Sequence, residues 1–341
     1  MSRKTPPWLR NLLKEAEALS RYDVGLTAEA LAGRLGVDPS SILKLNSNEN
    51  LFIPLEFLRN LLMEVVEELD PRFYPRDEFA ELQGALAGYL GVNPERIVLG
   101  AGSDQLIELL VHAFLKRGET VLSISPTFSI YERVVRAMGA DYEAVPLKED
   151  FSLDVGGMLN SADEGTRITF ICSPNNPTAN QFSYEAVKSI VEGFRGLIVL
   201  DETYAEFAKY SAIDLTEKHE NLVVLRTFSK VFGIAGLRLG YAVSSPEVAS
   251  TLRERYQMPY AVSSIALRMG VKLLERIDAI RRSITRLKEE RASLIRGLNR
   301  IERVQAFNSE TNFVLMNLQG MSSDDVYERL LDHGVIVRNI G

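Results

Sequence analysis

The nine residues LVVLRTFSK, from Leu222 to Lys230, join an apolar run to a Thr-Phe-Ser-Lys segment. A short run rich in β-branched residues is typical of a strand buried on both faces of a parallel sheet. A lysine at the end of such a strand is ordinarily solvated. Here Val231 and Phe232 follow it, and apolar surroundings lower the pKa of an amine and free its lone pair to attack an aldehyde. We therefore expect an α/β sheet in which Lys230 carries chemistry.

Comparable apolar runs lie on either side of this stretch and alternate with amphipathic segments. The predicted strands are 97–99, 121–124, 141–145, 168–172, 197–200, 222–225 and 239–243, and the helices between them include 104–116, 128–138 and 184–194. Alternation of this kind indicates βαβ units and a parallel sheet. The sequence therefore predicts one large α/β domain.

The pattern changes near residue 260, where helical spacing becomes dominant. Residues 262–303 carry Leu, Ile and Met three and four positions apart, and predicted strands at 312–318 and 335–338 flank a helix at 323–331. A chain of 341 residues also suits two domains. We predict a large domain at 46–260 and a smaller α+β domain at 261–341, with a segment at 1–45 that packs on the small domain or on a dimer partner.

The composition favours a protein that binds small molecules. The net charge is −7 at pH 7, and no block of Lys and Arg offers the positive surface that a nucleic acid requires. The N-terminus lacks the continuous apolar stretch of a signal peptide or membrane span. Cys172, the one cysteine, lies in an apolar run and excludes an internal disulfide. We expect a cytoplasmic protein with no nucleic-acid partner, no membrane partner and no metal.

Other strand ends carry polar groups, although each group alone has an ordinary explanation. The segment GAGSDQ at 100–105 opens a helix with glycines, as anion sites do, but it equally suits a tight turn with a capped helix. Asn176 lies in an SPNNP turn, and Asp201 ends an apolar strand three residues before Tyr204. Arg238 follows Lys230 by eight residues. The order of these groups is more informative than any one of them.

A pyridine aldehyde phosphate requires such a set of groups. Its phosphate requires N–H groups, hydroxyls and an arginine, and its ring nitrogen requires a carboxylate that keeps it protonated. Its phenolate oxygen requires amide and phenol donors, and its aldehyde requires a lysine. Because the strand ends deliver these groups in succession, we expect pyridoxal phosphate as the cofactor.

The sequence resembles the fold type I pyridoxal-phosphate enzymes and, within them, the histidinol-phosphate aminotransferases, over essentially the whole chain. The matching stretches are KLNSNEN at 44–50, RFYP at 72–75, GAGSD at 100–104, SPTF at 125–128, SPNNPT at 173–178, DETY at 201–204, RTFSK at 226–230 and GLRLGY at 236–241. The lysine segment marks the fold type, whereas KLNSNEN with RFYP is more specific to the subgroup. The resemblance implies an aspartate-aminotransferase-like fold, with a mostly parallel seven-stranded sheet in the large domain.

The resemblance also implies a role for each residue of the cofactor site. Lys230 would form the Schiff base and shuttle protons, Asp201 would pair with the ring nitrogen, and Tyr204 would donate to the phenolate oxygen together with Asn176. The residues around the phosphate would be Gly102, Ser103, Asp104, Ser229 and Arg238. Phe128 matches an aromatic residue that stacks on the ring, with plain core packing as its alternative. Tyr74 matches a tyrosine that reaches the phosphate of the neighbouring subunit, which implies a homodimer.

Histidinol phosphate carries a phosphate ester where an amino acid has its carboxylate, so its binding requires positive charge and polar donors. Arg338 matches a family arginine for that phosphate, and Tyr22 matches an N-terminal tyrosine near it. For Tyr22, packing at the surface explains the residue equally well. Asn48 lies in the segment that lines the substrate side.

The sequence departs from the family pattern at three places. Ala179 stands where the family has Gly, which suits the turn unless φ is positive there. Leu51 replaces a usual Pro. The family continues past residues 337–339 with a strand carrying a second substrate arginine, whereas the sequence stops at Gly341. We expect either a truncated chain or a small domain completed differently, which affects substrate binding more than cofactor binding.

We therefore predict reversible amino transfer from L-histidinol phosphate to 2-oxoglutarate, giving imidazole-acetol phosphate and L-glutamate, in histidine biosynthesis. The nearest alternatives share the cofactor: an aromatic or broad amino-acid aminotransferase, and a threonine-phosphate decarboxylase. A catalytically idle protein that binds pyridoxal phosphate is the alternative from another class.

Overall fold

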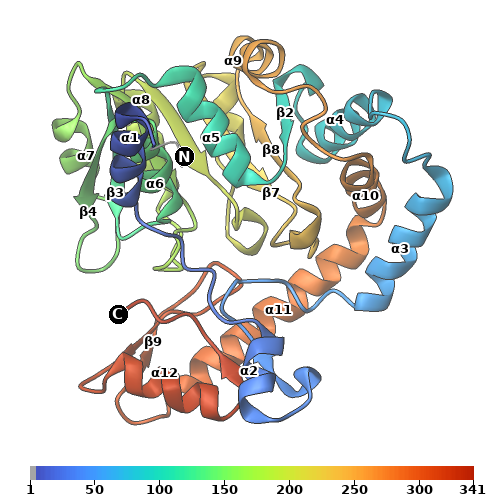
Figure 1. Ribbon diagram of the computed structural model, residues 1–341, viewed down its shortest axis with the longest axis vertical. Helices are drawn as coiled ribbons and strands as arrows, with labels where there is room; N and C mark the ends of the chain where they lie inside the picture. Colours follow the sequence, from blue (N-terminus) through green and yellow to red (C-terminus); the bar gives the residue numbers. More distant parts are fainter. Residues whose placement is uncertain (1–4) are drawn as a thin grey trace.

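A seven-stranded sheet forms the centre of the computed structural model, which describes residues 5–341 (Figure 1). The strands lie in the order β2-β8-β7-β6-β5-β3-β4, and β8 runs antiparallel to both of its neighbours while the other pairs are parallel. Their bounds are β2 (Ile97–Gly100), β3 (Thr120–Ser125), β4 (Asp141–Pro146), β5 (Thr166–Cys172), β6 (Leu197–Asp201), β7 (Leu222–Thr227) and β8 (Gly240–Val243). The predicted α/β fold with a mostly parallel seven-stranded sheet is confirmed.

Helices cover both faces of this sheet because side chains alternate between the faces along each strand. On β2, Val98 packs in the core that also contains α5 (Ser103–Phe114) and α6 (Ile130–Ala137). Its neighbours Ile97 and Leu99 point the other way, towards the helices α3 (Leu55–Glu68), α4 (Asp77–Leu90) and α10 (Ser264–Glu275). On the far strands, that second face is covered by α7 (Val155–Ser161) and α8 (Tyr184–Gly193). The sheet is therefore buried on both sides except at its edge strand β4, which is mostly exposed.

Serine residues define the first turn of four helices, as their capping chemistry predicts. The hydroxyls of Ser183, Ser245, Ser263 and Ser322 accept backbone N–H bonds at the starts of α8, α9 (Pro246–Thr251), α10 and α12 (Ser323–Asp332).

The described residues also form short helical turns. These are η1 (Pro39–Ser41), η2 (Pro94–Arg96), η3 (Ala205–Phe207), η4 (Ile213–Glu217), η5 (Ala235–Leu237) and η6 (Leu252–Tyr256).

The two ends of the chain build a second, smaller body beside the sheet. The long helix α11 (Ile277–Leu298) leads into it (Figure 1). β9 (Val304–Ala306) pairs antiparallel with β10 (Met316–Leu318), and β1 (Leu43–Lys44) pairs parallel with β11 (Val335–Ile336). A small core joins Leu31 of α2 (Ala28–Leu35) to Leu331 of α12 and Ile336 of β11. The predicted division at residues 45 and 260 stays a prediction, and the segment 1–45 begins outside the described residues.

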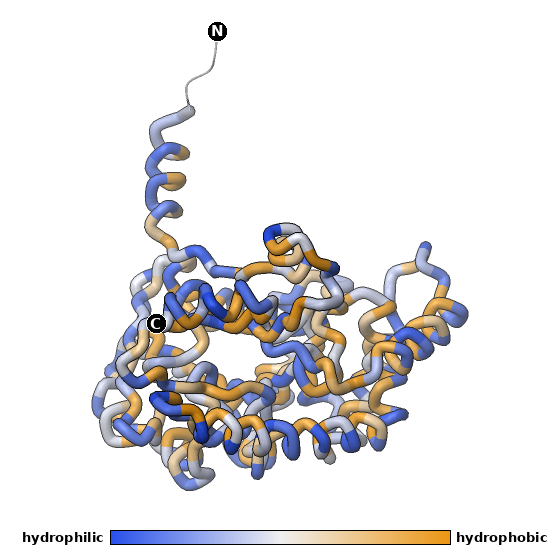
Figure 2. The backbone as a smooth tube through the Cα atoms, turned by 90° about the horizontal axis from the view of Figure 1, so that it is seen from below, coloured by the Kyte–Doolittle hydropathy of each residue, from blue (hydrophilic) through white to orange (hydrophobic). Residues whose placement is uncertain are grey.

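The first helix, α1 (Pro7–Glu17), stands away from the rest of the molecule (Figure 2). Its apolar side chains are largely exposed, at 67% for Trp8, 55% for Leu12 and 52% for Leu13. Within the described residues, no helix combines the length and the apolar character that a membrane crossing requires.

Candidate active site

The carboxyl ends of parallel strands bring the predicted cofactor residues to one edge of the sheet. β6 lies between β5 and β7. Asp201 at the end of β6 therefore lies between the turn of Asn176, which follows β5, and the segment of Lys230, which follows β7. β2 runs in the same direction because β8 is antiparallel to both β2 and β7, so the turn at Gly102 emerges at the same edge. Open α/β sheets bind ligands at this edge.

The amine of Lys230 has a defined position. Its Nζ donates a hydrogen bond to the backbone oxygen of Ser47 at 2.8 Å. Asn50 holds the same segment in place, because its Nδ2 donates to the backbone oxygen of Val231 at 3.0 Å. Burial lowers the pKa of Lys230 to about 8. The nearby carboxylates of Glu49 and Asp104 raise the pKa, but their effect is smaller than that of burial. An amine with this pKa is partly unprotonated near neutral pH, as a nucleophile must be.

Asp201 is a buried carboxylate with donors on both of its oxygens. Thr203 donates its backbone N–H and its hydroxyl to Oδ1 at 3.0 and 2.6 Å, and the hydroxyl of Tyr131 donates to Oδ2 at 2.7 Å. Burial raises the pKa of Asp201, and the bonds from Thr203 and Tyr131 lower it. The donors thus favour the ionised form, which a positively charged ring nitrogen requires of its partner.

Tyr204 is buried, and its hydroxyl accepts a hydrogen bond from Nδ2 of Asn48 at 3.1 Å. Burial raises its pKa well above the ordinary value for tyrosine, so the phenol stays neutral and keeps a hydrogen to donate. Asn48 has a positive φ of 54°, and its backbone oxygen accepts a bond from Nδ2 of Asn312 at 2.8 Å. The ring of Phe313 meets Tyr204 edge-on at 5.4 Å. Residues near β10 therefore contact the predicted site directly.

The turn after β5 uses its two asparagines differently. Asn175 is fully buried and binds two loops together: its Nδ2 donates to the oxygens of Pro126 and Thr178, and its Oδ1 accepts from Thr127. Asn176, the residue predicted to face the cofactor, is only partly buried. This division suits the prediction, because one amide fixes the turn and leaves the other available.

Ala179, the substituted glycine position, has a φ of 64° and is completely buried. The turn therefore has the positive φ that an alanine tolerates poorly, at a cost of roughly 1–2 kcal/mol. Its backbone N–H donates to the oxygen of Asn175 at 2.8 Å, which holds this conformation in place.

The start of α5 presents groups suited to a phosphate. Gly102 is its N-cap, with φ 86° and ψ 166°, and no side chain caps the helix there in the part of the chain that the structure describes. Arg238 lies beside this helix start: its guanidinium donates to Asp104 at 3.0 Å and to Ser229 at 3.4 Å. A Cβ on Gly102 would lie 2.5 Å from Nη2 of Arg238. Free N–H groups at a helix start, an arginine and hydroxyls together make an anion site.

One family model covers most of the chain: residues 40–341 match the model for class I and II aminotransferases. The chain belongs to this family.

The aminotransferase is similar to histidinol-phosphate aminotransferases and to aspartate aminotransferase. It is 35% identical to the histidinol-phosphate aminotransferase of Caldanaerobacter subterraneus subsp. tengcongensis over 298 residues, which cover 87% of this chain and 84% of the relative. The crystal structure of histidinol-phosphate aminotransferase from Sinorhizobium meliloti in complex with pyridoxal-5'-phosphate matches with a TM-score of 0.85 and 25% identity, over 100% of this chain and 90% of that one. A mutant of Thermus thermophilus aspartate aminotransferase, at 23% identity, shares the fold with a TM-score of 0.79 over 95% of this chain and 90% of its own.

Arg338 and Tyr22, the residues predicted to bind the substrate phosphate, lie together in the aminotransferase. The guanidinium carbon of Arg338 lies 5.6 Å from the centroid of the Tyr22 ring, and Nη1 donates to the backbone oxygen of Asp23 at 2.6 Å. The carboxylate of Asp23 pairs with the same nitrogen at 3.3 Å. The N-terminal segment therefore holds the arginine that follows β11.

Tyr74 stacks on Tyr260 at 4.6 Å, and its side chain is 75% exposed. Its neighbour Phe73 is 70% exposed. The segment that the resemblance assigns to a neighbouring active site is thus exposed in the single chain.

A buried ion network lies directly beneath the predicted site. Arg226 on β7 pairs with Glu202 and Glu206, each at 2.7 Å, and with the hydroxyl of Ser211 at 2.7 Å. Burial lowers the pKa of Arg226, but the two carboxylates more than offset this and raise it. Glu202 follows Asp201 in sequence, and Arg226 precedes Lys230 by four residues, so the network joins the ends of the two strands that carry them.

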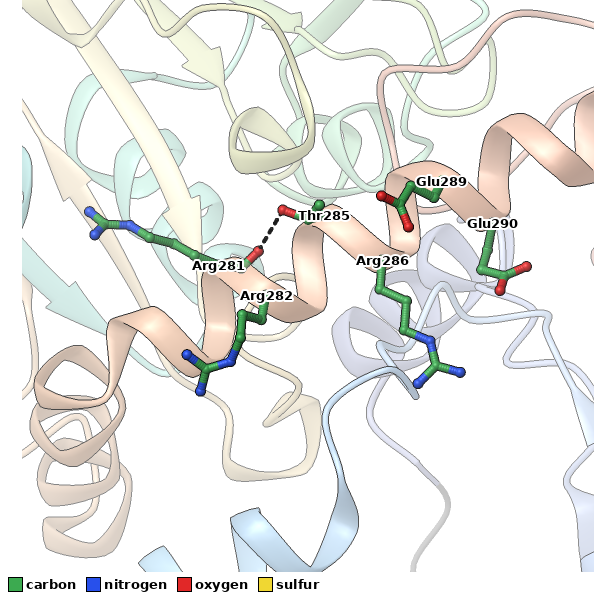
Figure 3. Close-up of a pocket in the computed structure, with 6 residues that line it drawn as sticks. All are labelled: Arg281, Arg282, Thr285, Arg286, Glu289 and Glu290. Atoms are coloured by element: carbon green, nitrogen blue, oxygen red, sulfur yellow. Dashed lines mark hydrogen bonds between the residues drawn. The ribbon is translucent and has the colours of Figure 1, made fainter.

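The pocket in Figure 3 lies along α11, and its lining includes none of the predicted site residues. Its lining consists of Arg281, Arg282, Thr285, Arg286, Glu289 and Glu290. Arg286 lies over the ring of Phe52 at 5.9 Å. Among residues 5–341, no group of three His, Cys, Asp or Glu side chains is placed to hold a metal ion.

Sequence reasoning missed Tyr131 and Asn312, which contact the predicted site residues Asp201 and Asn48. Tyr131 lies on α6, three residues after Phe128, which precedes that helix, and the two rings meet edge-on at 5.6 Å. Their spacing within the predicted helix 128–138 was the available signal, but the pattern equally describes a core residue.

Proposed function

We propose that this aminotransferase interconverts L-histidinol phosphate and 2-oxoglutarate with imidazole-acetol phosphate and L-glutamate, in histidine biosynthesis. The observation that carries the proposal is the 35% identity to a histidinol-phosphate aminotransferase over 87% of the chain. The cofactor is pyridoxal phosphate, which the Sinorhizobium meliloti structure contains.

The residues at the sheet edge fit the parts of this cofactor. When bound, the cofactor supplies a pyridinium ring that withdraws electrons from the reacting substrate carbon. Asp201 would hold a proton on the ring nitrogen, and the neutral phenol of Tyr204 would donate to the ring oxygen together with Asn176. The uncapped start of α5 and Arg238 would hold the phosphate.

Lys230 would bind the aldehyde and then act as the proton carrier of the reaction. A general base works best when its pKa lies near the working pH, and burial brings the pKa of Lys230 to about 8. Once the substrate amine has displaced it, Nζ of Lys230 would move a proton to and from the substrate carbon. Ser47, which accepts from Nζ at 2.8 Å, orients the amine.

The substrate phosphate would bind Arg338, with Tyr22 beside it. An arginine fork matches the geometry of a phosphate ester, and the ring of Tyr22 holds the guanidinium at 5.6 Å. Asn48 connects this side to the cofactor side through its bond to Tyr204 at 3.1 Å.

The proposed active unit is a homodimer in which Tyr74 of each subunit reaches the cofactor phosphate of the other. Exposed apolar residues support it, because a surface of this kind ordinarily marks an interface. They include Leu55, Met63, Phe73, Tyr74, Met258 and Tyr260, all at least 43% exposed. The apolar side chains of α1 would add to this interface.

The proposal also places the enzyme in the cytoplasm, where one buried thiol, Cys172, suits a reducing compartment. We likewise retain residues 46–260 as the large domain and 261–341 as the small one.

Turnover of competing substrates tests the proposed function. Purified protein with pyridoxal phosphate and 2-oxoglutarate should convert histidinol phosphate with a much higher kcat/KM than phenylalanine. A decarboxylase would instead release carbon dioxide from threonine phosphate. An idle binding protein would leave the visible absorbance of the cofactor unchanged when any amine is added. Lys230→Ala is the inactive control, and failure of the wild-type protein to turn over histidinol phosphate would overturn the proposal.

A further inference from the structure

The buried hydroxyl of Tyr131 is the donor that the structure gives to Oδ2 of Asp201. Both bonds from Thr203 go to Oδ1, whereas Tyr131 donates to Oδ2 at 2.7 Å. The bond crosses between layers, because Tyr131 lies on α6 and Asp201 ends β6. We propose that Tyr131 is a positioning residue for catalysis: it keeps Asp201 ionised and aimed at the ring nitrogen of the cofactor. This rests on the proposed function.

The phenol cannot turn away from the carboxylate. Tyr131 is completely buried, and its ring stacks on Phe170 of β5 at 4.7 Å with the planes only 7° apart. On another side its ring meets Phe128 edge-on at 5.6 Å. The same side chain therefore touches both the predicted partner of the ring nitrogen and the aromatic residue predicted to stack on the ring.

The surroundings of Asp201 make this bond matter. Burial favours the neutral acid, and Asp104 on α5 disfavours a second negative charge. The buried thiol of Cys172 on β5 carries no positive charge that could compensate. Thr203 and Tyr131 are the groups that favour the carboxylate. Burial also raises the pKa of Tyr131 far above its ordinary value, so it remains a donor over the working pH range. Without its hydroxyl, Asp201 would take up a proton at higher pH.

A neutral Asp201 would no longer hold the ring nitrogen protonated. The visible absorbance of bound pyridoxal phosphate reports the charge of its ring system, so its pH titration gives a readout that does not depend on turnover. A residue that only fills the core would leave this titration unchanged.

The test compares Tyr131→Phe with a matched control, Tyr241→Phe. Tyr241 is also completely buried in the sheet, and its hydroxyl has no hydrogen-bond partner among the described residues. Both changes remove one oxygen and retain the ring. We expect Tyr131→Phe to lower kcat roughly tenfold or more, the scale of one hydrogen bond to a charged group, with little change in KM. It should also shift the pH titration of the absorbance, whereas Tyr241→Phe should do neither.

The variant Asp201→Asn separates this proposal from the proposed function. Because Tyr131 acts through Asp201, Tyr131→Phe should have no further effect in the Asp201→Asn background, as a double-mutant cycle would show. The role of Tyr131 would be overturned if the absorbance of Tyr131→Phe titrated with pH as in the wild type. It would also be overturned if Tyr131→Phe lowered kcat equally in the wild-type and Asp201→Asn backgrounds. If Asp201→Asn itself left the absorbance and kcat unchanged, the cofactor placement would be wrong instead. Thermal unfolding of each apo variant identifies any that fails to fold.

Discussion

At the scale of single residues, Lys230 shows how burial prepares an ordinary side chain for chemistry. Its amine would have a pKa of 10.5 in water, and burial lowers this to about 8. The amine attacks an aldehyde only when it is unprotonated. We therefore predict that the rate at which the apo protein captures pyridoxal phosphate rises with pH and levels off above about 8.

Rapid-mixing absorbance measurements between pH 6 and 10 would check this. Lys230→Ala should show no absorbance change, because it lacks the amine that captures the cofactor. A capture rate that still rises steeply at pH 10, as the ordinary pKa of 10.5 would require, would contradict the effect of burial.

Local sequence patterns identified residues at strand ends better than residues that reach a site from another layer. Lys230, Asp201 and Tyr204 follow apolar strands, so the parallel sheet brings them to one edge. Tyr131 lies on a helix, and its bond to Asp201 depends on how α6 packs on β5. Asn312 contacts the site because of the fold of the smaller body. In neither case does the sequence near the residue indicate its partner.

At the scale of elements, the turn from β2 to α5 depends on a glycine. Gly102 has a φ of 86°, and a Cβ there would lie 2.5 Å from the guanidinium of Arg238. Gly118 has a φ of 79°, but no atom lies within 4 Å of its added Cβ. We predict that both Gly→Ala changes destabilise the protein by about 1–3 kcal/mol through backbone strain. Only Gly102→Ala should also weaken pyridoxal phosphate binding.

Urea unfolding of the apo proteins and equilibrium dialysis with the cofactor would measure the two effects separately. Equal cofactor affinity of the two variants would contradict the assignment of this turn to the phosphate.

The buried ion network of Arg226, Glu202 and Glu206 stabilises the fold as well as joining the ends of β6 and β7. Removing one partner of a buried pair leaves an uncompensated charge, which costs about 3–5 kcal/mol. We predict a loss of that size for Arg226→Met, because Glu202 and Glu206 would both remain buried. Arg136→Met is the control, since its pair with Glu132 lies on the exposed face of α6 and contributes about 0.3–0.5 kcal/mol. Similar unfolding midpoints for the two variants would show that the network contributes little.

At the scale of the whole molecule, the proposed homodimer predicts that each active site is shared, with the exposed Tyr74 of one subunit reaching the site of the other. Inactive Lys230→Ala and Tyr74→Ala proteins, unfolded and refolded together, should form hybrid dimers. Each hybrid would contain one site with both native residues, so random mixing should restore about a quarter of the wild-type activity. Steady-state assays before and after mixing would measure this. No recovery, in a mixture shown to contain dimers, would place Tyr74 outside the partner's site.

The large sheet could be predicted from the sequence, but the smaller body only in part. Six of the seven strands have a continuous apolar signal, because they are buried on both faces. The edge strand β4, with the sequence DYEAVP, is mostly exposed and was predicted only by its place between helical segments. The predicted strand at 312–318 is strand only at Met316–Leu318. The earlier part, with Asn312 and Phe313, turns instead towards Asn48 and Tyr204. The pairing of β1 with β11 joins residues from opposite ends of the chain, so no local pattern reveals it.

That pairing has a consequence for the order in which a newly made chain folds. Domains fold as the ribosome releases them, beginning at the N-terminus. All strands of the seven-stranded sheet have been made once synthesis has passed Val243, yet Leu43 and Lys44 then still lack β11. We expect a nascent chain to form the sheet edge with the predicted cofactor site first. The predicted substrate side, where Tyr22 meets Arg338, would form only after Arg338 has been made.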